Sequence, residues 1–437
     1  MSPRSPKLAV SAVSHRAPSA SCRSSAALLP ACALAGLGLA WSPSAAQAAP
    51  CAVPETGHLT IQSAINDARC TEIDLKAQIY TEQINVNRAG RPVTLRGLGA
   101  GRTVLASPLR RNRSTVSTTF LRNYVYVVQV APGSTLTLAD LTVDGGGNAR
   151  CTEPYFGLRA HNATLNLDAV VVENVRGRGT DFACANVFAL GVTAEGTGAA
   201  SLSLSRATVR GFQQAGILAR GSNAKLSLGD TLVRGVGEQS QQAQTGIWVR
   251  DGATATLDRA TVRDLRFTGD PCKGLGTGVR FSAAAASTTT ASVLLGCDRG
   301  IELSKNSAAI DIKGNRFVDN FAGVFASEDS AGASRIVQNG FAGTRRSTAT
   351  NVAMCFADSG DAIAIKGEKD ALVQGNSAAD SARCAIELLA GTSNLDVQEN
   401  QSVRSARVDI EDAGSGNRLA KNLCLSSTPA GLCTGTP

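Results

Sequence analysis

Short runs in which apolar and polar residues alternate recur along residues 157–388 of this 437-residue chain. Each run starts with Gly or Ala, followed by an aliphatic residue, a variable residue, and another small or aliphatic residue. Nine such starts begin at Gly157, Gly191, Gly216, Gly246, Gly278, Gly300, Gly323, Ala362 and Ala385. The shortest intervals between them, 22 and 23 residues, indicate the length of the basic repeat.

Further alternating runs lie between successive starts, such as Ser201-Leu202-Ser203-Leu204 followed by Ala207-Thr208-Val209-Arg210. Alternation with a period of two is typical of a strand that buries one face. Three short strands per repeat, separated by Gly, Asn and Ser corners, predict a three-sided coil. Stacked coils would place equivalent strands about 4.8 Å apart. We therefore predict an all-β solenoid with a narrow aliphatic core.

Composition supports a narrow core, because aromatic residues make up only 4% of the chain. Hydrophobic residues at 43% and charged residues at 18% exclude a disordered, charge-rich chain. After residue 49, no apolar run reaches the length of a membrane span.

Asparagines recur at expected corners of the C-terminal half, at Asn315, Asn320, Asn339, Asn376 and Asn400. Asparagine tolerates left-handed backbone geometry, and its amide can bond to the coils above and below. The pattern favours a ladder of stacked asparagines over the alternative of scattered surface turns.

Residues 1–49 have the features of a signal peptide. A basic stretch without acidic residues precedes the apolar run from Ala26 to Trp41, and Ala46-Gln47-Ala48 fits a small-x-small cleavage site. A membrane anchor is a weaker interpretation, because the apolar run is short for a span. A lipoprotein modified at Cys32 is also disfavoured, because the apolar run continues past that residue. We expect a secreted or periplasmic protein.

Cleavage would remove four positive charges and no negative ones, so the net charge of +8 would fall to +4. A net positive charge of this size does not by itself imply a nucleic-acid partner, and none is expected. Ten cysteines would remain, and disulfides are the default in an oxidising compartment. Pairing of neighbours predicts the bonds Cys51–Cys70, Cys151–Cys184, Cys272–Cys297, Cys355–Cys384 and Cys424–Cys433. A cysteine-based metal site is disfavoured, because there is no CxxC motif and only two histidines remain.

Together with an N-terminal block, the repeat resembles the pectin-lyase-like right-handed parallel β-helix proteins. The block comprises Thr60 to Asp67, Glu72 to Leu75, Tyr80 to Val86 and Val93 to Gly97. In similar proteins, the first segment is a short helix that caps the open end of the solenoid. The resemblance implies one right-handed β-helix domain over residues 50–437, with a cap at 50–75, coils over about 76–423 and a tail at 424–437. The bond Cys51–Cys70 would pin the cap, and Cys424–Cys433 would close the other end.

Two columns of outward-pointing residues are expected on the face formed by the starts. The first contains Arg159, Thr193, Leu218, Trp248, Arg280, Glu302, Phe325, Ala364 and Glu387. The second contains His161, Glu195, Arg220, Arg250, Ser282, Ser304, Ser327, Lys366 and Leu389.

Between residues 157 and 280, the two columns are rich in arginine and contain one tryptophan. Arginine pairs with carboxylates and an aromatic ring stacks on sugars, so this face suits an acidic polysaccharide. The expected binding residues are Arg159, Glu195, Arg220 and Trp248. Lyase chemistry would need a cation to neutralise the uronate and a base to remove its C5 proton, and the expected catalytic residues are Arg250, Arg280 and His161. The alternative is a solvated face of long side chains.

Glu387 and Glu411 form a second candidate, because continuation of the repeat would place them in one column, one strand spacing apart. Two close carboxylates can bind a cation or serve a retaining glycosidase. Asp358 and Asp361 lie just before the start at Ala362. Ordinary surface acids are the alternative. The cofactor is left open, with calcium as one option that no motif supports.

No catalytic residue can be transferred from the enzyme families with this fold. The polygalacturonase combination of Asn-x-Asp, Asp-Asp and Gly-His-Gly, the aspartate cluster of calcium-dependent pectate lyases, and the Asp-Pro-His motif of alginate epimerases are not found. We therefore expect an exported β-helix that binds, and by β-elimination cleaves, an acidic polysaccharide. The alternative is a non-catalytic secreted or surface scaffold. Intervals of 30 to 39 residues between some starts indicate inserted loops, which would favour the enzyme if they flank the arginine–tryptophan face.

Overall fold

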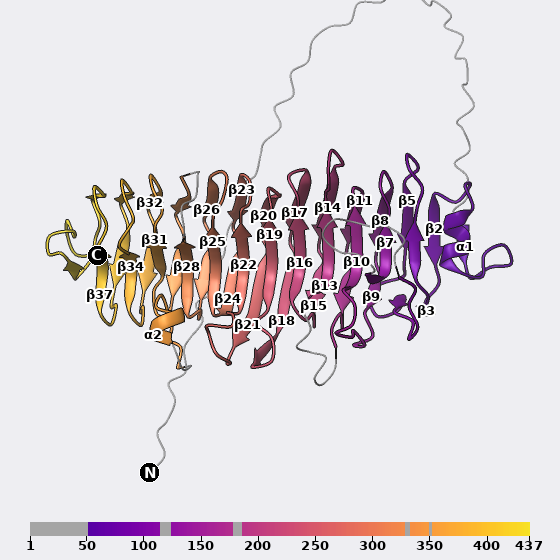
Figure 1. Ribbon diagram of the computed structural model, residues 1–437, viewed down its shortest axis with the longest axis horizontal. Coiled ribbons are helices and arrows are strands. Elements are labelled where there is room, and N and C mark those ends of the chain that lie inside the picture. Colours follow the sequence, from indigo (N-terminus) through magenta and orange to yellow (C-terminus); the bar gives the residue numbers. More distant parts are fainter. Residues whose placement is uncertain (1–50, 114–123, 178–185, 328–332, 349–351) are drawn as a thin grey trace, which may run out of the picture. The chain divides into compact units, whose positions relative to one another are not determined.

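The computed structural model describes residues 51–113, 124–177, 186–327, 333–348 and 352–437 (Figure 1). The predicted signal peptide lies outside these residues. Neither helix of the described part has the length and apolar character needed to span a bilayer.

Strands of the described residues form three sheets of 14, 13 and 12 strands, and the named strands all pair in parallel. The chain visits the sheets in turn. β2 (Glu72–Leu75) belongs to the 14-stranded sheet, β3 (Ile79–Thr81) to the 12-stranded sheet and β4 (Ile84–Val86) to the 13-stranded sheet. The next three strands repeat this order one coil further on. The predicted all-β solenoid of three-sided coils is confirmed.

The strands of each sheet follow one another in chain order. The 14-stranded sheet contains β1 (Cys51–Val53), β2, β5 (Val93–Arg96), β8 (Thr135–Ala139), β11 (Thr164–Asp168), β14 (Ala200–Ser205), β17 (Ala224–Gly229), β20 (Thr254–Asp258), β23 (Ser287–Thr290), β26 (Ile310–Lys313), β29 (Arg335–Val337), β32 (Leu372–Gln374), β35 (Asp396–Gln398) and β38 (Arg418–Ala420). The 12-stranded sheet contains β3, β6 (Val104–Ala106), β9 (Thr142–Asp144), β12 (Val171–Glu173), β15 (Thr208–Arg210), β18 (Leu232–Gln239), β21 (Thr261–Phe267), β24 (Val293–Cys297), β27 (Arg316–Val318), β30 (Gly340–Ala342), β33 (Ser377–Ala379) and β36 (Gln401–Val403). The 13-stranded sheet contains β4, β7 (Val125–Val130), β10 (Tyr155–His161), β13 (Val187–Thr193), β16 (Ala215–Arg220), β19 (Thr245–Arg250), β22 (Thr277–Ser282), β25 (Arg299–Ser304), β28 (Ala322–Ser327), β31 (Ile363–Lys366), β34 (Cys384–Leu388), β37 (Val408–Asp412) and β39 (Ser427–Thr428).

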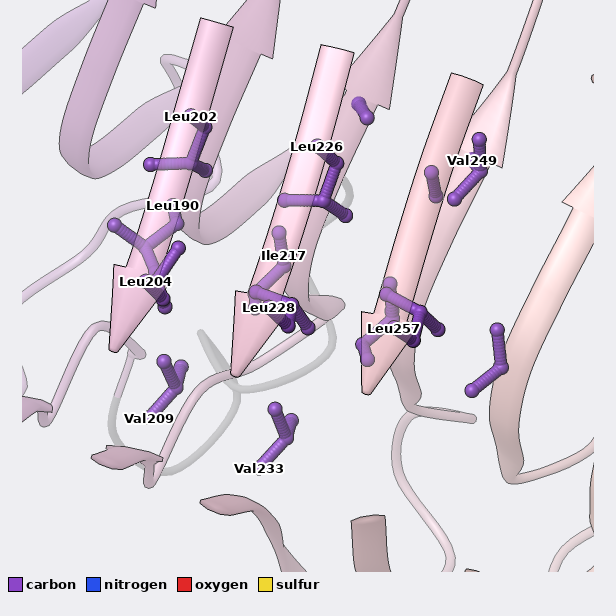
Figure 2. Packing of buried hydrophobic residues seen from close by; sticks show 14 of the residues in the cluster. Leu190, Leu202, Leu204, Val209, Ile217, Leu226, Leu228, Val233, Val249 and Leu257 are labelled. Carbon is purple, nitrogen blue, oxygen red and sulfur yellow. The ribbon is translucent and has the colours of Figure 1, made fainter. Parts of the chain in front are cut away.

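Aliphatic side chains from all three sheets meet inside the coils (Figure 2). In the 14-stranded sheet, Leu202 pairs with Leu226 and Leu204 with Leu228, so like residues stack from coil to coil. Each such residue is almost fully buried, which stabilises the fold by roughly 1.5–3 kcal/mol per side chain. Alternation along each strand therefore fixes both the core and the register, because a slip of one residue would turn the leucines outward.

Glycine is required at several of the starts because adjacent coils approach closely there. A Cβ atom on Gly216 would lie 2.7 Å from the carbonyl oxygen of Gly246, and one on Gly300 would lie 2.6 Å from that of Gly323. The recurrent glycine of the sequence pattern thus has a steric cause.

The N-terminal cap contains the short helix α1 (Ile61–Asn66), which was predicted from the resemblance. Thr60 and Ser63 form a capping box at its start. The backbone N–H groups of Ile61 and Gln62 donate to the Glu82 carboxylate at 2.9 and 3.0 Å. The apolar face of α1 packs on the core cluster and covers its open end.

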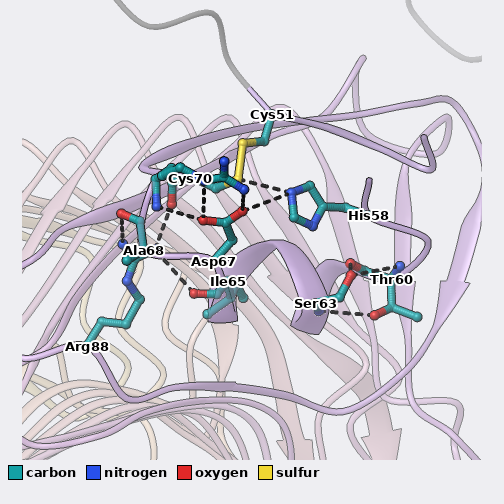
Figure 3. The surroundings of a disulfide bond; sticks show 10 residues. Cys51, His58, Thr60, Ser63, Ile65, Asp67, Ala68, Cys70 and Arg88 are labelled. Atoms are coloured by element: carbon teal, nitrogen blue, oxygen red, sulfur yellow. Dashed lines mark hydrogen bonds and ion pairs between the residues drawn. A yellow bond between two sulfur atoms is a disulfide. The ribbon is translucent and has the colours of Figure 1, made fainter. Parts of the chain in front are cut away.

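Cys51 and Cys70 form the predicted disulfide beside this helix (Figure 3). The Arg88 guanidinium donates to the carbonyl oxygens of Ile65 and Cys70, at 3.2 and 2.6 Å, and so satisfies groups at the end of the cap. One arginine and one disulfide therefore attach the cap to the first coils.

The predicted bond Cys424–Cys433 is present at the C-terminal end. Cys151 is also disulfide-bonded, but its predicted partner, Cys184, lies outside the described residues.

Two predicted disulfides, Cys272–Cys297 and Cys355–Cys384, are wrong. Cys272 bonds instead to Cys355, across 83 residues, whereas Cys297 and Cys384 are buried free thiols. Pairing by sequence proximity failed because Cys272 and Cys355 lie on insertions, and Cys355 ends the short helix α2 (Val352–Cys355). The free cysteines instead lie within β24 and β34.

The predicted asparagine ladder is confirmed. The backbone N–H and the Nδ2 group of Asn315 donate to Oδ1 of Asn339, at 2.9 and 3.1 Å. The same pair of bonds links Asn339 to Asn376, Asn376 to Asn400, and Asn400 to Asn422, which the sequence pattern missed. Asn320 bonds to the preceding coil at another corner, where its Oδ1 accepts the N–H of Cys297.

Removal of one amide should break the ladder. We expect Asn339→Ala to lower the free energy of unfolding by about 3 kcal/mol, because it leaves buried donors and acceptors on both neighbouring coils unsatisfied. Thermal unfolding at a fixed scan rate would measure this loss. Asn166→Ala, which removes a single long, part-buried side-chain bond, is the control. Equal melting temperatures of the two variants would contradict a stabilising ladder.

Candidate functional site

The candidate site lies where successive strands of the 13-stranded sheet end. The last residues of five consecutive strands pair in register and form one column: His161, Thr193, Arg220, Arg250 and Ser282. Because the strands are parallel, one edge of the sheet carries all five side chains. This edge column agrees with the second predicted column except at one coil, where Thr193 takes the place of Glu195.

Two residues of the predicted columns are placed differently in the structure. Leu158 pairs with Leu190, so Gly191 and not Thr193 is the neighbour of Arg159. The predicted alignment was therefore two residues out at this coil. A shift of two preserves the alternation of a strand, so the hydrophobic pattern cannot detect it. Thr193 belongs to the edge column, and Glu195 follows in the turn.

A cleft of about 490 Å³ opens beside the first coils of the edge column. Its lining brings together three predicted residues, His161, Glu195 and Arg220. It also includes Asn162 and Asp251, which sequence reasoning did not nominate. The predicted residues Arg250 and Arg280 lie on later coils. By strand spacing, Arg250 is roughly 14 Å from His161 along the column.

His161 is 5% exposed, and its Nδ1 lies 3.2 Å from the Thr193 hydroxyl. The Thr193 oxygen also accepts a hydrogen bond from Nη2 of Arg159, at 3.3 Å. Burial and the nearby Arg159 charge lower the pKa of His161, and the Glu195 charge opposes this shift. The imidazole is therefore neutral near pH 7, the form in which it can accept a proton.

The turn that carries Glu195 is fixed by Asn162. The Asn162 side chain donates to the carbonyl oxygen of Glu195 at 3.2 Å and accepts its backbone N–H at 2.8 Å. Gly221 adopts a φ of 99°, and a Cβ there would lie 2.1 Å from the carbonyl oxygen of Ala194. The backbone of the cleft is therefore closely packed and admits no larger residue at this position.

Asp251 links the two arginines of the edge column. It accepts the Nε–H of Arg220 at 2.5 Å, and its carboxylate lies 3.3 Å from Nε of Arg250. One carboxylate thus contacts two guanidinium groups, and the Glu195 carboxylate lines the same cleft. Both arginine side chains are about a quarter exposed, at 26% and 27%.

Trp248 lies between two arginines on the outer face of the sheet. The guanidinium carbon of Arg250 is 4.6 Å from the centre of the indole ring, and that of Arg280 is 5.6 Å away. Arg280 also contacts Glu302 at 3.2 Å. The Trp248 Nε1–H is buried and has no hydrogen-bond partner among the described residues. The predicted combination of an aromatic ring and arginines is present.

Much of the first predicted column is buried, contrary to expectation. Arg159 is fully buried, and its guanidinium carbon lies 3.8 Å from the centre of the Tyr124 ring. Further along, the column residue Glu302 is buried and lies 3.4 Å from Arg299, which in turn forms a two-pronged ion pair with Asp358 at 2.7 and 2.9 Å. These contacts come from segments outside the strands that fold over the sheet. The sequence pattern could not reveal them, because it reports only alternation within strands.

Insertions adjoin the edge where strands of the 13-stranded sheet begin. They connect β6 to β7, β18 to β19, β21 to β22 and β30 to β31. The bond Cys272–Cys355 joins two of them. Buried Asp298 accepts the N–H groups of Gly276 and Phe267, at 2.6 and 3.0 Å, and burial raises its pKa to about 7. Because these insertions precede the strands and the cleft lies where the strands end, the inserted loops flank the arginine–tryptophan face on the side opposite the cleft.

Glu387 and Glu411 pair in register, as predicted from the repeat. Their carboxylates and the Cys384 thiol lie within 4.8 Å of one another. Arg383 contacts Glu387, and Arg407 donates to Glu411 at 2.8 Å. Because both carboxylates form ion pairs with arginines, Glu387 and Glu411 belong to a network of charged side chains.

Comparisons with known proteins agree with this architecture. The family model described as "Right handed beta helix region" matches residues 190–353. A search of curated protein sequences found no match. Among solved structures, a mutant of the periplasmic alginate epimerase AlgG is similar over 80% of this chain and 77% of its own, with 8% identity and a TM-score of 0.50.

The chain has the pectin-lyase-like right-handed parallel β-helix fold. Gene product 12 of bacteriophage phi29 shares the arrangement, with 10% identity and a TM-score of 0.53 over 80% of this chain. This β-helix spans only 48% of the phage protein. Such distant similarities show the fold alone, so the chemistry of the site has to be argued from its own residues.

The pKa of His161 can be measured directly by NMR, since the chain has only three histidines. We expect a pKa below the ordinary value of 6.5. Glu195→Gln should lower it further, and Arg159→Met should raise it, because these charges act on the imidazolium in opposite directions. His161→Gln assigns the signal. Insensitivity of the pKa to both substitutions would contradict the geometry of the cleft.

Proposed function

We propose that this β-helix binds an acidic polysaccharide along the ends of the strands of the 13-stranded sheet and cleaves it by β-elimination. The observation that carries the proposal is the cleft in which His161, Glu195 and Arg220 converge beside Trp248 and Arg250. A sugar chain is long enough to occupy the cleft and the arginine–tryptophan surface together.

Binding is inferred from two kinds of contact: ion pairs between arginine and a uronate carboxylate, and stacking of a sugar on an aromatic ring. Arg220 and Arg250 lie side by side at the strand ends and are about a quarter exposed, so both guanidinium groups can approach a uronate carboxylate. Trp248 offers an apolar surface to the face of a neighbouring sugar. Both interactions occur along one line of the sheet, which favours an extended ligand.

Cleavage requires a base near a neutralised uronate. In the tautomer that donates from Nδ1 to Thr193, the Nε2 lone pair of His161 is free to accept the C5 proton. The C5 electrons then form the C4–C5 double bond, and the C4–O4 bond breaks with its electron pair leaving on oxygen, which gains a proton. Arg220 lines the same cleft and would bind the uronate carboxylate, which stabilises the charge that develops during proton removal.

Two further observations support an exported carbohydrate-binding protein. The fold is shared with a protein named as a periplasmic alginate epimerase. The described residues also contain three complete disulfides, which persist in oxidising compartments outside the cytosol.

Cleavage of polymannuronate, polyguluronate, pectate and hyaluronate can be followed by absorbance of the unsaturated product. We expect activity on at least one of them. His161→Gln should abolish it while affinity changes less than about threefold, and Arg250→Ala should weaken binding by about tenfold through loss of a charge-assisted hydrogen bond.

Arg263→Ala is the matched control, because Arg263 also neighbours an aspartate but lies on the 12-stranded sheet. Equal losses of affinity in the Arg250 and Arg263 variants would contradict the assigned face. Absence of both binding and cleavage across these polymers would favour the non-catalytic scaffold instead.

A further inference from the structure

Three arginines converge in a second pocket, on insertions at the strand-start edge of the 13-stranded sheet. This pocket of about 300 Å³ is lined by Leu109, Arg110, Arg111, Arg150 and Glu153. Its residues lie on the connections from β6 to β7 and from β9 to β10. The proposed reaction uses none of them.

Charge is unbalanced in this pocket. Glu153 contacts Arg113 at 3.6 Å, which compensates its negative charge. Arg110, Arg111 and Arg150 have no carboxylate partner among the described residues. Elsewhere on the coils, arginines commonly meet an acid of an adjacent coil, as Arg206 does with Asp168. The pocket therefore concentrates positive charge that the described residues leave uncompensated.

The central arginine is held in place before any ligand arrives. Nη2 of Arg111 donates to the carbonyl oxygen of Asn148 at 3.1 Å, and Nη1 contacts the Asn148 side chain. The guanidinium carbon lies 4.4 Å from the centre of the buried Tyr155 ring. Nε of Arg111 is buried and has no hydrogen-bond partner within the described residues. An arginine fixed in this way loses little side-chain entropy when it binds an anion.

The neighbouring backbone is also restrained. Arg150 directly precedes the disulfide-bonded Cys151. Tyr155 donates its hydroxyl to the carbonyl oxygen of Gly145 at 2.9 Å, which ties the end of this connection to its start. The arginines on the two connections are therefore presented by anchored segments.

We propose that this pocket binds a tetrahedral oxyanion, either phosphate or sulfate, as the free ion or as an ester on a larger molecule. Three guanidinium groups without a carboxylate partner among the described residues offer N–H donors in several directions. They suit the three or four acceptor oxygens of a tetrahedral anion better than the two oxygens of a planar carboxylate. The site is independent of the proposed polysaccharide cleft.

Titration calorimetry of the full chain with sodium phosphate and sodium sulfate, against sodium acetate at the same ionic strength, tests the site. We expect saturable binding of phosphate or sulfate and at least tenfold weaker binding of acetate. Arg150→Ala and Arg111→Ala should each reduce affinity by about tenfold. Arg91→Ala removes the same charge from an exposed arginine on a different connection and should leave affinity unchanged.

Arg150 is exposed, so its variant should fold even if loss of Arg111 disturbs Tyr155. Equal affinity for acetate and phosphate, or wild-type affinity in Arg150→Ala, would overturn the proposal. A sulfated glucan oligosaccharide and its unsulfated form distinguish the sources. Tighter binding of the sulfated form than of inorganic sulfate assigns the site to esters, whereas weaker binding assigns it to the free ion.

Discussion

In-register parallel pairing between successive coils is the constraint on which the whole molecule depends. Backbone hydrogen bonds repeat from coil to coil, so a residue at the end of one strand is brought next to its equivalent more than 20 residues away. The asparagine ladder and the stacked leucines stabilise the same register from inside. Positions that are remote in sequence therefore become adjacent columns, and the edge column of the candidate site is one of them.

Charge on this framework is organised by the same stacking. Arginines of one coil meet acids of a neighbouring coil, as Arg210 does with Glu173 and Arg234 with Asp264. Such exposed pairs contribute little to stability. Their greater significance is that they leave the surface nearly compensated, so places with excess arginine stand out. The pocket of Arg110, Arg111 and Arg150 is such a place, whereas Arg220 and Arg250 of the edge column both contact Asp251.

The sequence predicted what depends on periodicity. Alternation and the recurrent glycines predicted the three-sided coil, and the recurring asparagines predicted most of the asparagine ladder, whereas the cap was predicted from the resemblance. The pairing of Glu387 with Glu411 also followed from the repeat alone. The repeat also placed His161, Glu195 and Arg220 in one outward-pointing column, and the structure brings the three into a common cleft.

Features set by the insertions could not be predicted in this way. Burial of Arg159 beneath Tyr124 and the bond between Cys272 and Cys355 both depend on how non-repeating segments fold back. The misplacement of Thr193 has a different origin, since a two-residue shift leaves the alternation intact. Asp251 would have been found by asking which residue follows each strand end, because Asn162 and Asp251 both occupy that position with positive φ.

A crystal structure with a bound oligouronate would show whether stacking of the coils creates one continuous ligand surface. We expect sugar density along the strand ends, with a ring on Trp248, a carboxylate at Arg250 and a further sugar in the cleft of His161. Sugar density confined to another sheet, or a sugar chain that crosses the coils without contact to this column, would contradict it.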